Sequence, residues 1–130
     1  MHRLVLTFGM IMGITLSALG QDTTEVLMQD NEFKPKNITI EKGDVVKWVH
    51  DGNNAHNTVS GTNCSPDGIW ESKLFSEKGK TFTFKFDNTG DFPYYCDPHC
   101  GLDMVGNVTV ENATGVTEKP QKVELKAYPN

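Results

Sequence analysis

The chain has 130 residues, of which 37% are hydrophobic and 22% are charged, the composition of one ordinary globular domain. A second domain is not expected at this length. The formal net charge is −5 at pH 7, with 17 acidic residues against 12 lysines and arginines. Nucleic acid and anionic membrane surfaces are therefore poor partners, because both repel an acidic protein.

The first twenty residues have the features of a secretory signal. His2 and Arg3 form a basic start, residues 4–16 an apolar run, and residues 18–20 a small-residue cleavage site. The apolar run is shorter than the about 20 residues that span a bilayer. Residues 1–20 therefore predict export, to a periplasm, the cell surface or the extracellular space, without stable membrane insertion.

Short β-branched and aromatic runs separated by turn residues predict an all-β chain, and no amphipathic stretch is long enough for a sizeable helix. The predicted strands cover residues 24–28, 38–40, 45–50, 55–59, 82–86, 92–96 and 104–110. Residues 60–69 are expected to form a loop, and residues 70–75 a weak extended or partly helical segment. About seven short strands predict a small Greek-key β-sandwich in residues 21–110.

Period-two alternation also predicts the core and the end of the domain. Val46 and Trp48 share one face of their strand, and the three alternating phenylalanines of residues 82–86 share another, so both sets should point inward. After residue 110 the pattern decays. Residues 111–130 are therefore expected to be a C-terminal extension, either flexible or forming an edge strand.

The residues that indicate a chemical function lie in the segment 95–104. Cys96, His99 and Met104 fall within nine residues of one another. Two imidazoles and one thiolate, with a weak axial thioether, are the ligand set of a blue copper site, so a second histidine must come from elsewhere. His56 follows a turn that can bring it beside the Cys96 loop. His50 is its rival, but its place at a strand end favours the surface or a position behind the ligands.

These segments resemble the cupredoxin family, in particular plastocyanin and pseudoazurin. Residues 54–59 (NAHNTV) are similar to the segment that carries the family's first histidine ligand. Residues 94–99 (YYCDPH), followed by Gly101 and by residues 104–110 (MVGNVTV), resemble the closing motif Cys-x2-His-x4-Met. The resemblance covers residues 25–110.

The resemblance implies a soluble, monomeric electron carrier with one copper ion, and no enzymatic activity. His56, Cys96 and His99 would form the ligand plane, and Met104 the weak axial contact. Asn57 would be one of the hydrogen-bond donors around the Cys96 sulfur, which tune the reduction potential. Such a site exchanges single electrons by outer-sphere transfer between larger redox proteins, a donor and an acceptor.

The resemblance also implies where electrons enter and leave. The exposed edge of His99, framed by Pro98, Gly101 and Leu102, would be the main electron port, and Tyr95 would mark a second route. Partners with basic docking surfaces are expected, steered by acidic residues near the amino end of the domain. Those residues are Asp22, Glu25, Asp30 and Glu32.

Two further cysteines depart from the plastocyanin pattern. Cys100 directly follows His99, and Cys64 lies eight residues after His56. This placement resembles plant phytocyanins, in which a disulfide links the residue after the second histidine ligand to the loop after the first. The resemblance therefore implies a bridge between Cys64 and Cys100, which an oxidising compartment would favour.

Three other interpretations stay open. The spacing of Cys96, Cys100 and Gly101 also resembles the start of a dinuclear purple copper motif, although Met104 stands where that motif needs a histidine. A structural zinc site could use Cys64, Cys96, Cys100 and a histidine. Copper storage or delivery is the third, and it would require ligand exchange at the metal. Enzymatic copper chemistry is not favoured, because it needs an additional histidine cluster.

Overall fold

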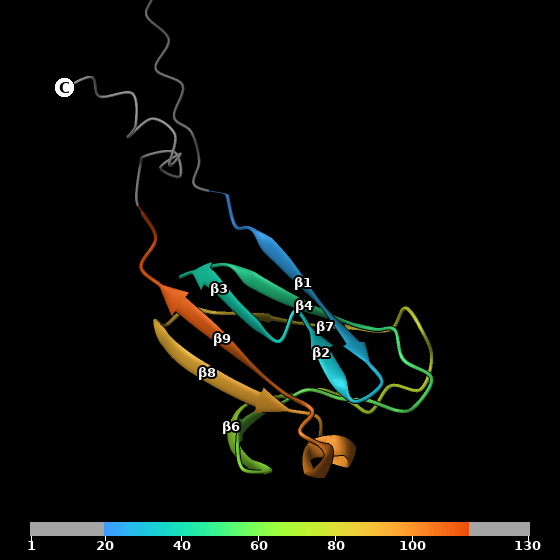
Figure 1. The fold of residues 1–130 in the computed structure, drawn as a ribbon. Helices are drawn as coiled ribbons and strands as arrows, with labels where there is room; N and C mark the ends of the chain where they lie inside the picture. Colours follow the sequence, from blue (N-terminus) through green and yellow to red (C-terminus); the bar gives the residue numbers. More distant parts are fainter. Residues whose placement is uncertain (1–19, 115–130) are drawn as a thin grey trace, which may run out of the picture.

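The computed structural model of the protein describes residues 20–114, and the strands in this part form two sheets packed face to face (Figure 1). One sheet has the order β2-β1-β4-β7, and the other has the order β3-β9-β8-β5-β6. The predicted β-sandwich is therefore confirmed. The predicted signal segment lies outside the described residues, as does all but the first few residues of the predicted extension.

The strands of the first sheet are β1 (Thr23–Gln29), β2 (Glu32–Lys34), β4 (Val45–His50) and β7 (Thr81–Lys85). Those of the second sheet are β3 (Asn37–Glu41), β5 (Val59–Thr62), β6 (Ser65–Glu71), β8 (Gly90–Tyr95) and β9 (Val105–Glu111). A 3-10 helix, η1 (Asp97–Leu102), joins β8 to β9. It lies at the end of the sandwich opposite the start of β1 and the end of β9 (Figure 1). Within residues 20–114, no helix is long and apolar enough to cross a bilayer.

The core lies between the sheets and is rich in aromatic rings. Trp48 from β4 and Tyr94 from β8 are fully buried and meet edge to face at 5.4 Å between ring centroids. Trp70 packs against Trp48 at the same distance. The inward direction predicted for Val46 and Trp48 is confirmed, because both are 0% exposed. Burial of such large apolar side chains is the main favourable term in folding.

One local expectation was wrong, and one short strand was missed. Residues 60–69 are not a loop: β5 and β6 form an antiparallel hairpin, with Thr62 opposite Ser65. The turn between these strands uses Asn63 and Cys64, both with positive φ, so the chain reverses in two residues. Gly61, at φ +142°, accepts close contact with the Ser65 carbonyl, which a side chain would prevent. The short strand β2 was also not predicted.

Candidate metal centre

The register of the second sheet brings two distant segments together at one end of the sandwich. β5 and β8 pair antiparallel with Val59 opposite Tyr95, so the residues before Val59 lie beside those after Tyr95. β8 and β9 pair with Tyr95 opposite Val105, and the Cys96 N–H donates to the Met104 carbonyl at 3.0 Å. Strand pairing therefore places His56, Cys96 and Met104 at the same end.

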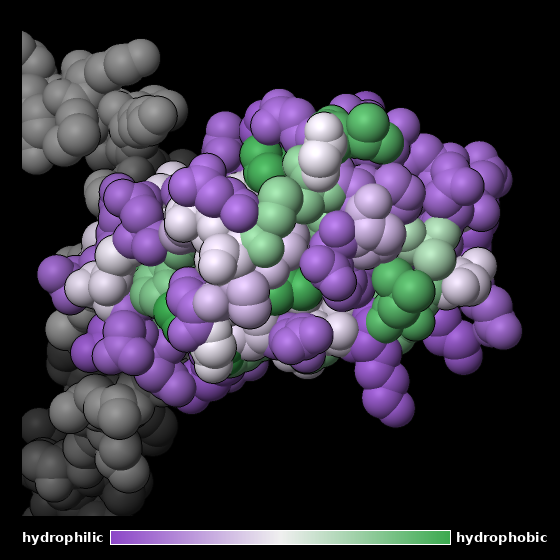
Figure 2. Space-filling model, turned by 90° about the horizontal axis from the view of Figure 1, so that it is seen from below, coloured by the Kyte–Doolittle hydropathy of each residue, from purple (hydrophilic) through white to green (hydrophobic). Residues whose placement is uncertain are grey.

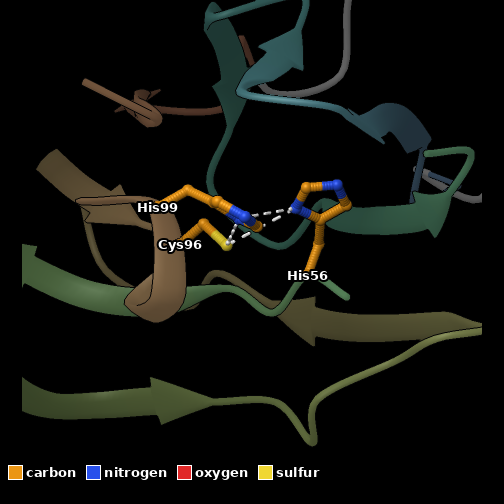
Figure 3. Close-up of side chains that lie close together, drawn as sticks. All are labelled: His56, Cys96 and His99. Carbon is orange, nitrogen blue, oxygen red and sulfur yellow. Dashed lines mark hydrogen bonds between the residues drawn. The ribbon is translucent and has the colours of Figure 1, made fainter. Parts of the chain in front are cut away.

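His56, Cys96 and His99 form a cluster whose side chains point toward one another (Figure 3). Their potential ligand atoms all lie within 4.8 Å of one another. The two Nδ1 atoms are 3.1 Å apart, and the Cys96 Sγ lies 3.7 Å from Nδ1 of His56 and 3.5 Å from Nδ1 of His99. His56 and Cys96 are fully buried, whereas His99 is partly exposed.

These distances fit one metal ion held by all three residues. Nitrogen and sulfur ligands bind a first-row divalent metal at about 2.0–2.3 Å, so three of them in one plane stand about 3.5–3.8 Å apart. The two sulfur–nitrogen distances already match this spacing. The shorter nitrogen–nitrogen distance is that of a hydrogen bond between the two rings. A thiolate with two imidazoles is a donor set that suits copper better than it suits harder cations such as Mg²⁺ or Ca²⁺.

His56 is held in place by its backbone and by its ring. Its backbone N–H and carbonyl both bond to Phe75, in an isolated β-bridge. Its Nε2 lies 2.9 Å from a carboxylate oxygen of Asp30. Because a carboxylate only accepts hydrogen bonds, Nε2 carries the proton and Nδ1 faces the cluster with a lone pair. Burial lowers the pKa of His56 below 6.5, although the bond to Asp30 opposes this shift.

Cys96 is a buried thiol in the described chain, and its surroundings have opposing effects on its pKa. Burial raises the pKa of Cys96 above its usual value of 9.0, while backbone N–H groups of Asn57 and His99 bond to the sulfur and favour the thiolate. Asn57 also accepts the Asp97 N–H on its Oδ1 at 2.8 Å. The backbone of Asn57 therefore lies against the sulfur, while its side chain bonds to Asp97.

The remaining predicted residues fall around this cluster. Met104 is fully buried next to Cys96, and its N–H donates to the His99 carbonyl at 3.3 Å. Pro98, Gly101 and Leu102 lie on η1 and are exposed, with Leu102 at 63%. Tyr95 is only 2% exposed. Its ring therefore does not itself offer a surface for a partner to touch, as a port would.

His50 does not join the cluster. It is 1% exposed, so the expected surface position is wrong, and its ring lies 5.4 Å from that of His56. Its Nε2 is 2.8 Å from the Asn54 carbonyl. His50 thus packs behind His56, which was the other position considered for it.

The cysteines exclude two of the alternative sites. Cys64 and Cys100 form a disulfide, as predicted, across a sequence separation of 36 residues. Neither sulfur is then free as a thiolate, so a zinc site built on Cys64, Cys96 and Cys100 is excluded. A dinuclear copper site that uses Cys100 is excluded for the same reason.

Asp30 is the residue of this site that sequence reasoning missed, since it was considered only as one of several surface charges. Its carboxylate instead contacts His56 and the turn that precedes it. The sequence holds a signal for this contact only if β1 and β4 are known to be parallel, because that pairing places the residues after β1 beside those after β4.

Comparisons with known proteins agree with this geometry. A plastocyanin from the chloroplast of Tetradesmus obliquus is 36% identical over 84 residues, which cover 61% of this chain and 58% of that protein. The chloroplastic plastocyanin of Chlamydomonas reinhardtii is 32% identical over 108 residues, 77% of this chain and 74% of that protein. The chain thus spans less than two thirds of the Tetradesmus protein.

Among solved structures, one described as a novel purple cupredoxin from Nitrosopumilus maritimus superposes with a TM-score of 0.61 at 26% identity, covering 67% of this chain and 98% of that one. Residues 21–111 match the family of copper-binding proteins described as plastocyanin/azurin. The sandwich, the buried Cys–His–His cluster and these matches show that the chain belongs to the plastocyanin/azurin family of copper-binding proteins.

Proposed function

We propose that the protein is an electron carrier with a single type 1 copper site, in which His56, Cys96 and His99 would hold the metal and Met104 would supply a weak thioether ligand. One observation carries the proposal: a thiol and two imidazole nitrogens, from segments about 40 residues apart, converge in a mostly buried cluster. Bound copper would supply a one-electron couple, for which thiolate and thioether suit Cu(I) and imidazole suits both states.

The protein's own residues would keep the site unchanged between the two oxidation states. Cys96, His56 and Met104 are fully buried, so water is kept from three of the four proposed ligands. The N–H groups that bond to the sulfur, from Asn57 and His99, belong to backbone fixed by the fold. A rigid and dry site of this kind lowers the reorganisation that accompanies each electron transfer, because its dipoles are already in place.

The proposed electron port is the surface around His99. His99 is the one histidine of the cluster that is partly exposed, and Pro98, Gly101 and Leu102 beside it are exposed. Figure 2 views the molecule from below, the side on which η1 and β6 lie in Figure 1, and shows small apolar patches among hydrophilic residues. An electron transferred through the His99 ring would therefore reach a docked partner without any change of ligands.

Redox proteins are the proposed partners, with basic docking surfaces attracted by the net charge of −5. Of the acidic residues considered for steering, Glu25 pairs with Lys47 at 3.1 Å and Asp30 is bonded to the site, so neither is a free charge. If acidic residues steer the encounter, the association rate should fall as salt is raised. A rate that does not change with ionic strength would remove steering from the proposal.

We also propose that residues 1–20 are removed on export and that residues 21–110 form the functional domain. β9 ends at Glu111, which supports a domain boundary near this residue. Mass spectrometry of the protein recovered from the periplasm or medium of an expressing cell should give the mass of a chain without its first twenty residues. Recovery of the full-length chain from the cytoplasm alone would contradict export.

The site is tested by adding Cu(II) to the purified protein and recording its visible spectrum. The expected result is one copper per chain with an intense thiolate band, and loss of that band in Cys96→Ser. Thr109→Ser, a conservative change in β9 away from the cluster, is a matched control that should leave the band unchanged. A parent without the band, or a Cys96→Ser variant that keeps it, would contradict the assignment.

Electron carriage and copper delivery are separated by a second measurement. An electron carrier should pass through many cycles of oxidation and reduction at an electrode without releasing copper to a chelator. Transfer of copper to the chelator within a few cycles would instead indicate storage or delivery.

A further inference from the structure

Asp30 accepts an unusual number of hydrogen bonds for a surface carboxylate. It lies in the turn between β1 and β2, and its side chain is 29% exposed. Its oxygens accept the backbone N–H of Asn53 at 2.9 Å, that of Asn54 at 3.0 Å, and the Asn53 side-chain amide at 3.1 Å. The fourth donor is Nε2 of His56, at 2.9 Å. The carboxylate therefore joins the turn before His56 to the ring of His56 itself.

The fold brings Asp30 to this place through a parallel strand pair. β1 and β4 pair in parallel with Met28 opposite His50. Continued past the ends of both strands, the same register sets Asp30 next to Gly52. Asp30 is thus positioned by two adjacent strands of the sheet rather than by a free surface loop.

Gly52 shows that the contact between Asp30 and His56 leaves no spare space. A Cβ at position 52 would stand 2.5 Å from a carboxylate oxygen of Asp30 and 2.6 Å from Nε2 of His56. Real Cβ atoms do not approach other atoms so closely, so a side chain here would force the two groups apart. The hydrogen bond between Asp30 and His56 therefore requires a glycine at position 52. This requirement is an observation separate from the length of the bond.

We propose that Asp30 is a positioning residue for the copper site: it fixes the His56 ring with Nδ1 toward the metal, and its negative charge favours Cu(II) over Cu(I). This inference rests on the proposed function. A carboxylate bonded to the outer nitrogen of a ligand imidazole fixes its tautomer and makes it a stronger donor. A stronger donor and a nearby negative charge both stabilise the more positive oxidation state, so Asp30 lowers the reduction potential.

The charge that this role needs is secured by the same contacts. The backbone N–H of Asn54, followed by His56 and Asn53, holds the pKa of Asp30 far below its usual value of 3.8. Asp30 is therefore ionised at neutral pH. A purely structural role, in which Asp30 only closes the turn at Asn53 and Asn54, would affect stability but not the ring of His56 or the potential.

Four variants separate these roles. Asp30→Asn keeps an oxygen acceptor but loses the charge, and Asp30→Ala loses both. Gly52→Ala keeps the charge but pushes Asp30 away from His56. Glu32→Gln is the matched control, because it removes one exposed negative charge two residues away, on β2.

Two measurements are made on each variant. The first is the protonation of the two His56 ring nitrogens in metal-free protein, by nitrogen NMR. The parent and Glu32→Gln should show the proton on Nε2 alone, whereas Asp30→Ala and Gly52→Ala should show a mixture of tautomers. The second is the midpoint potential of the copper-loaded protein.

Asp30→Asn should raise the midpoint potential by an amount that corresponds to a roughly tenfold loss of preference for Cu(II), about 59 mV for one electron. Asp30→Ala should raise it at least as much, and Glu32→Gln clearly less. A potential for Asp30→Asn equal to that of Glu32→Gln would overturn the charge effect. An unchanged tautomer in both Asp30→Ala and Gly52→Ala would overturn the positioning effect.

The proposal can still be tested if one variant does not fold. If Asp30→Ala does not fold, Asp30→Asn and Gly52→Ala still decide, since one tests the charge and the other the contact. A parent chain that takes up no copper would contradict the proposed function and with it the effect on the potential. The tautomer of His56 in the metal-free protein would then still decide whether Asp30 positions the ring.

Discussion

The two histidines of the cluster are the same chemical group held in opposite ways. His56 is fully buried, fixed by two backbone bonds to Phe75 and by the carboxylate of Asp30. His99 is partly exposed on the short helix η1, and the residue after it is bound through a disulfide to Cys64. The His56 ring is thus held by hydrogen bonds inside the sandwich. The backbone that carries His99 is held by a disulfide near the surface of the sandwich.

This difference suits the electron carrier proposed above, which would have to combine two tasks. The His56 region excludes water and sets the orientation of one ligand, which requires burial. In that proposal, the His99 region would have to come close to a partner, which requires exposure and so gives up most of the packing that holds a buried side chain. A disulfide instead ties η1 covalently to the turn between β5 and β6 without covering it.

The largest effect should come from removing each ring in turn. Both His56→Gly and His99→Gly should abolish the visible band of the copper-loaded protein. Added imidazole should restore the band in His99→Gly, because the space left by a partly exposed ring opens to solvent. It should restore little or none in His56→Gly, where the space is enclosed and faces Asp30. Titration with imidazole, followed in the visible spectrum, checks this difference. Equal recovery in both variants would show that the two spaces are equally open to solvent.

The disulfide gives the next largest effect. The double variant Cys64→Ala with Cys100→Ala should lose about 4 kcal/mol of unfolding free energy in the chain-entropy model, given a sequence separation of 36 residues. Urea denaturation of the metal-free proteins measures this loss. The rate of copper loss to a chelator should also increase, because His99 is the ligand that the bridge restrains. A double variant as stable as the parent would show that the bridge does not stabilise the fold.

Much of the fold could be predicted because alternation in short strands depends only on local sequence. β4 was predicted with its observed bounds, Val45–His50, and its two inward-facing residues are buried. The hairpin of β5 and β6 was missed because Gly61, Pro66 and Gly68 are typical loop residues. Pro66 and Gly68 are tolerated because β6 is an edge strand with mostly exposed residues, where a proline costs no central hydrogen bond.

The residues of the site also divide into those that local sequence indicates and those that depend on distant strands. Cys96, His99 and Met104 lie on one loop, so their spacing alone indicates the ligand set. His56 had to be chosen over His50, and the choice depended on which side of a turn faces the loop. Asp30 could not be recognised, since its contact with His56 depends on the parallel pairing of two strands separated by a long connection. Residues that act through non-local pairing carry no local pattern.

A smaller effect should come from a second bond between the two histidine regions, beside the one between their rings. Asn57, next to His56, accepts the N–H of Asp97 at the start of η1. Asn57→Ala should lower the unfolding free energy by about 1 kcal/mol, the net value of one such hydrogen bond. Asn54→Ala is the matched control, because its side chain is exposed. Equal losses in the two variants would show that the bond to Asp97 does not hold the regions together.

The smallest effect should lie outside both regions and should leave the metal site unchanged. Asp91 on β8 accepts hydrogen bonds from Thr109 and Asn107 on β9, and these bonds lower the pKa of Asp91 below 3.8. A carboxyl whose pKa is lower in the folded state stabilises the fold above its unfolded pKa, and that contribution is lost as the pH falls through the folded pKa. Asp91→Ala should therefore be slightly less stable than the parent at pH 7, and the difference should shrink in strong acid. Urea denaturation at both pH values measures the difference. A visible band altered by Asp91→Ala would show that the sheet away from the His56 and His99 regions also controls the ligands.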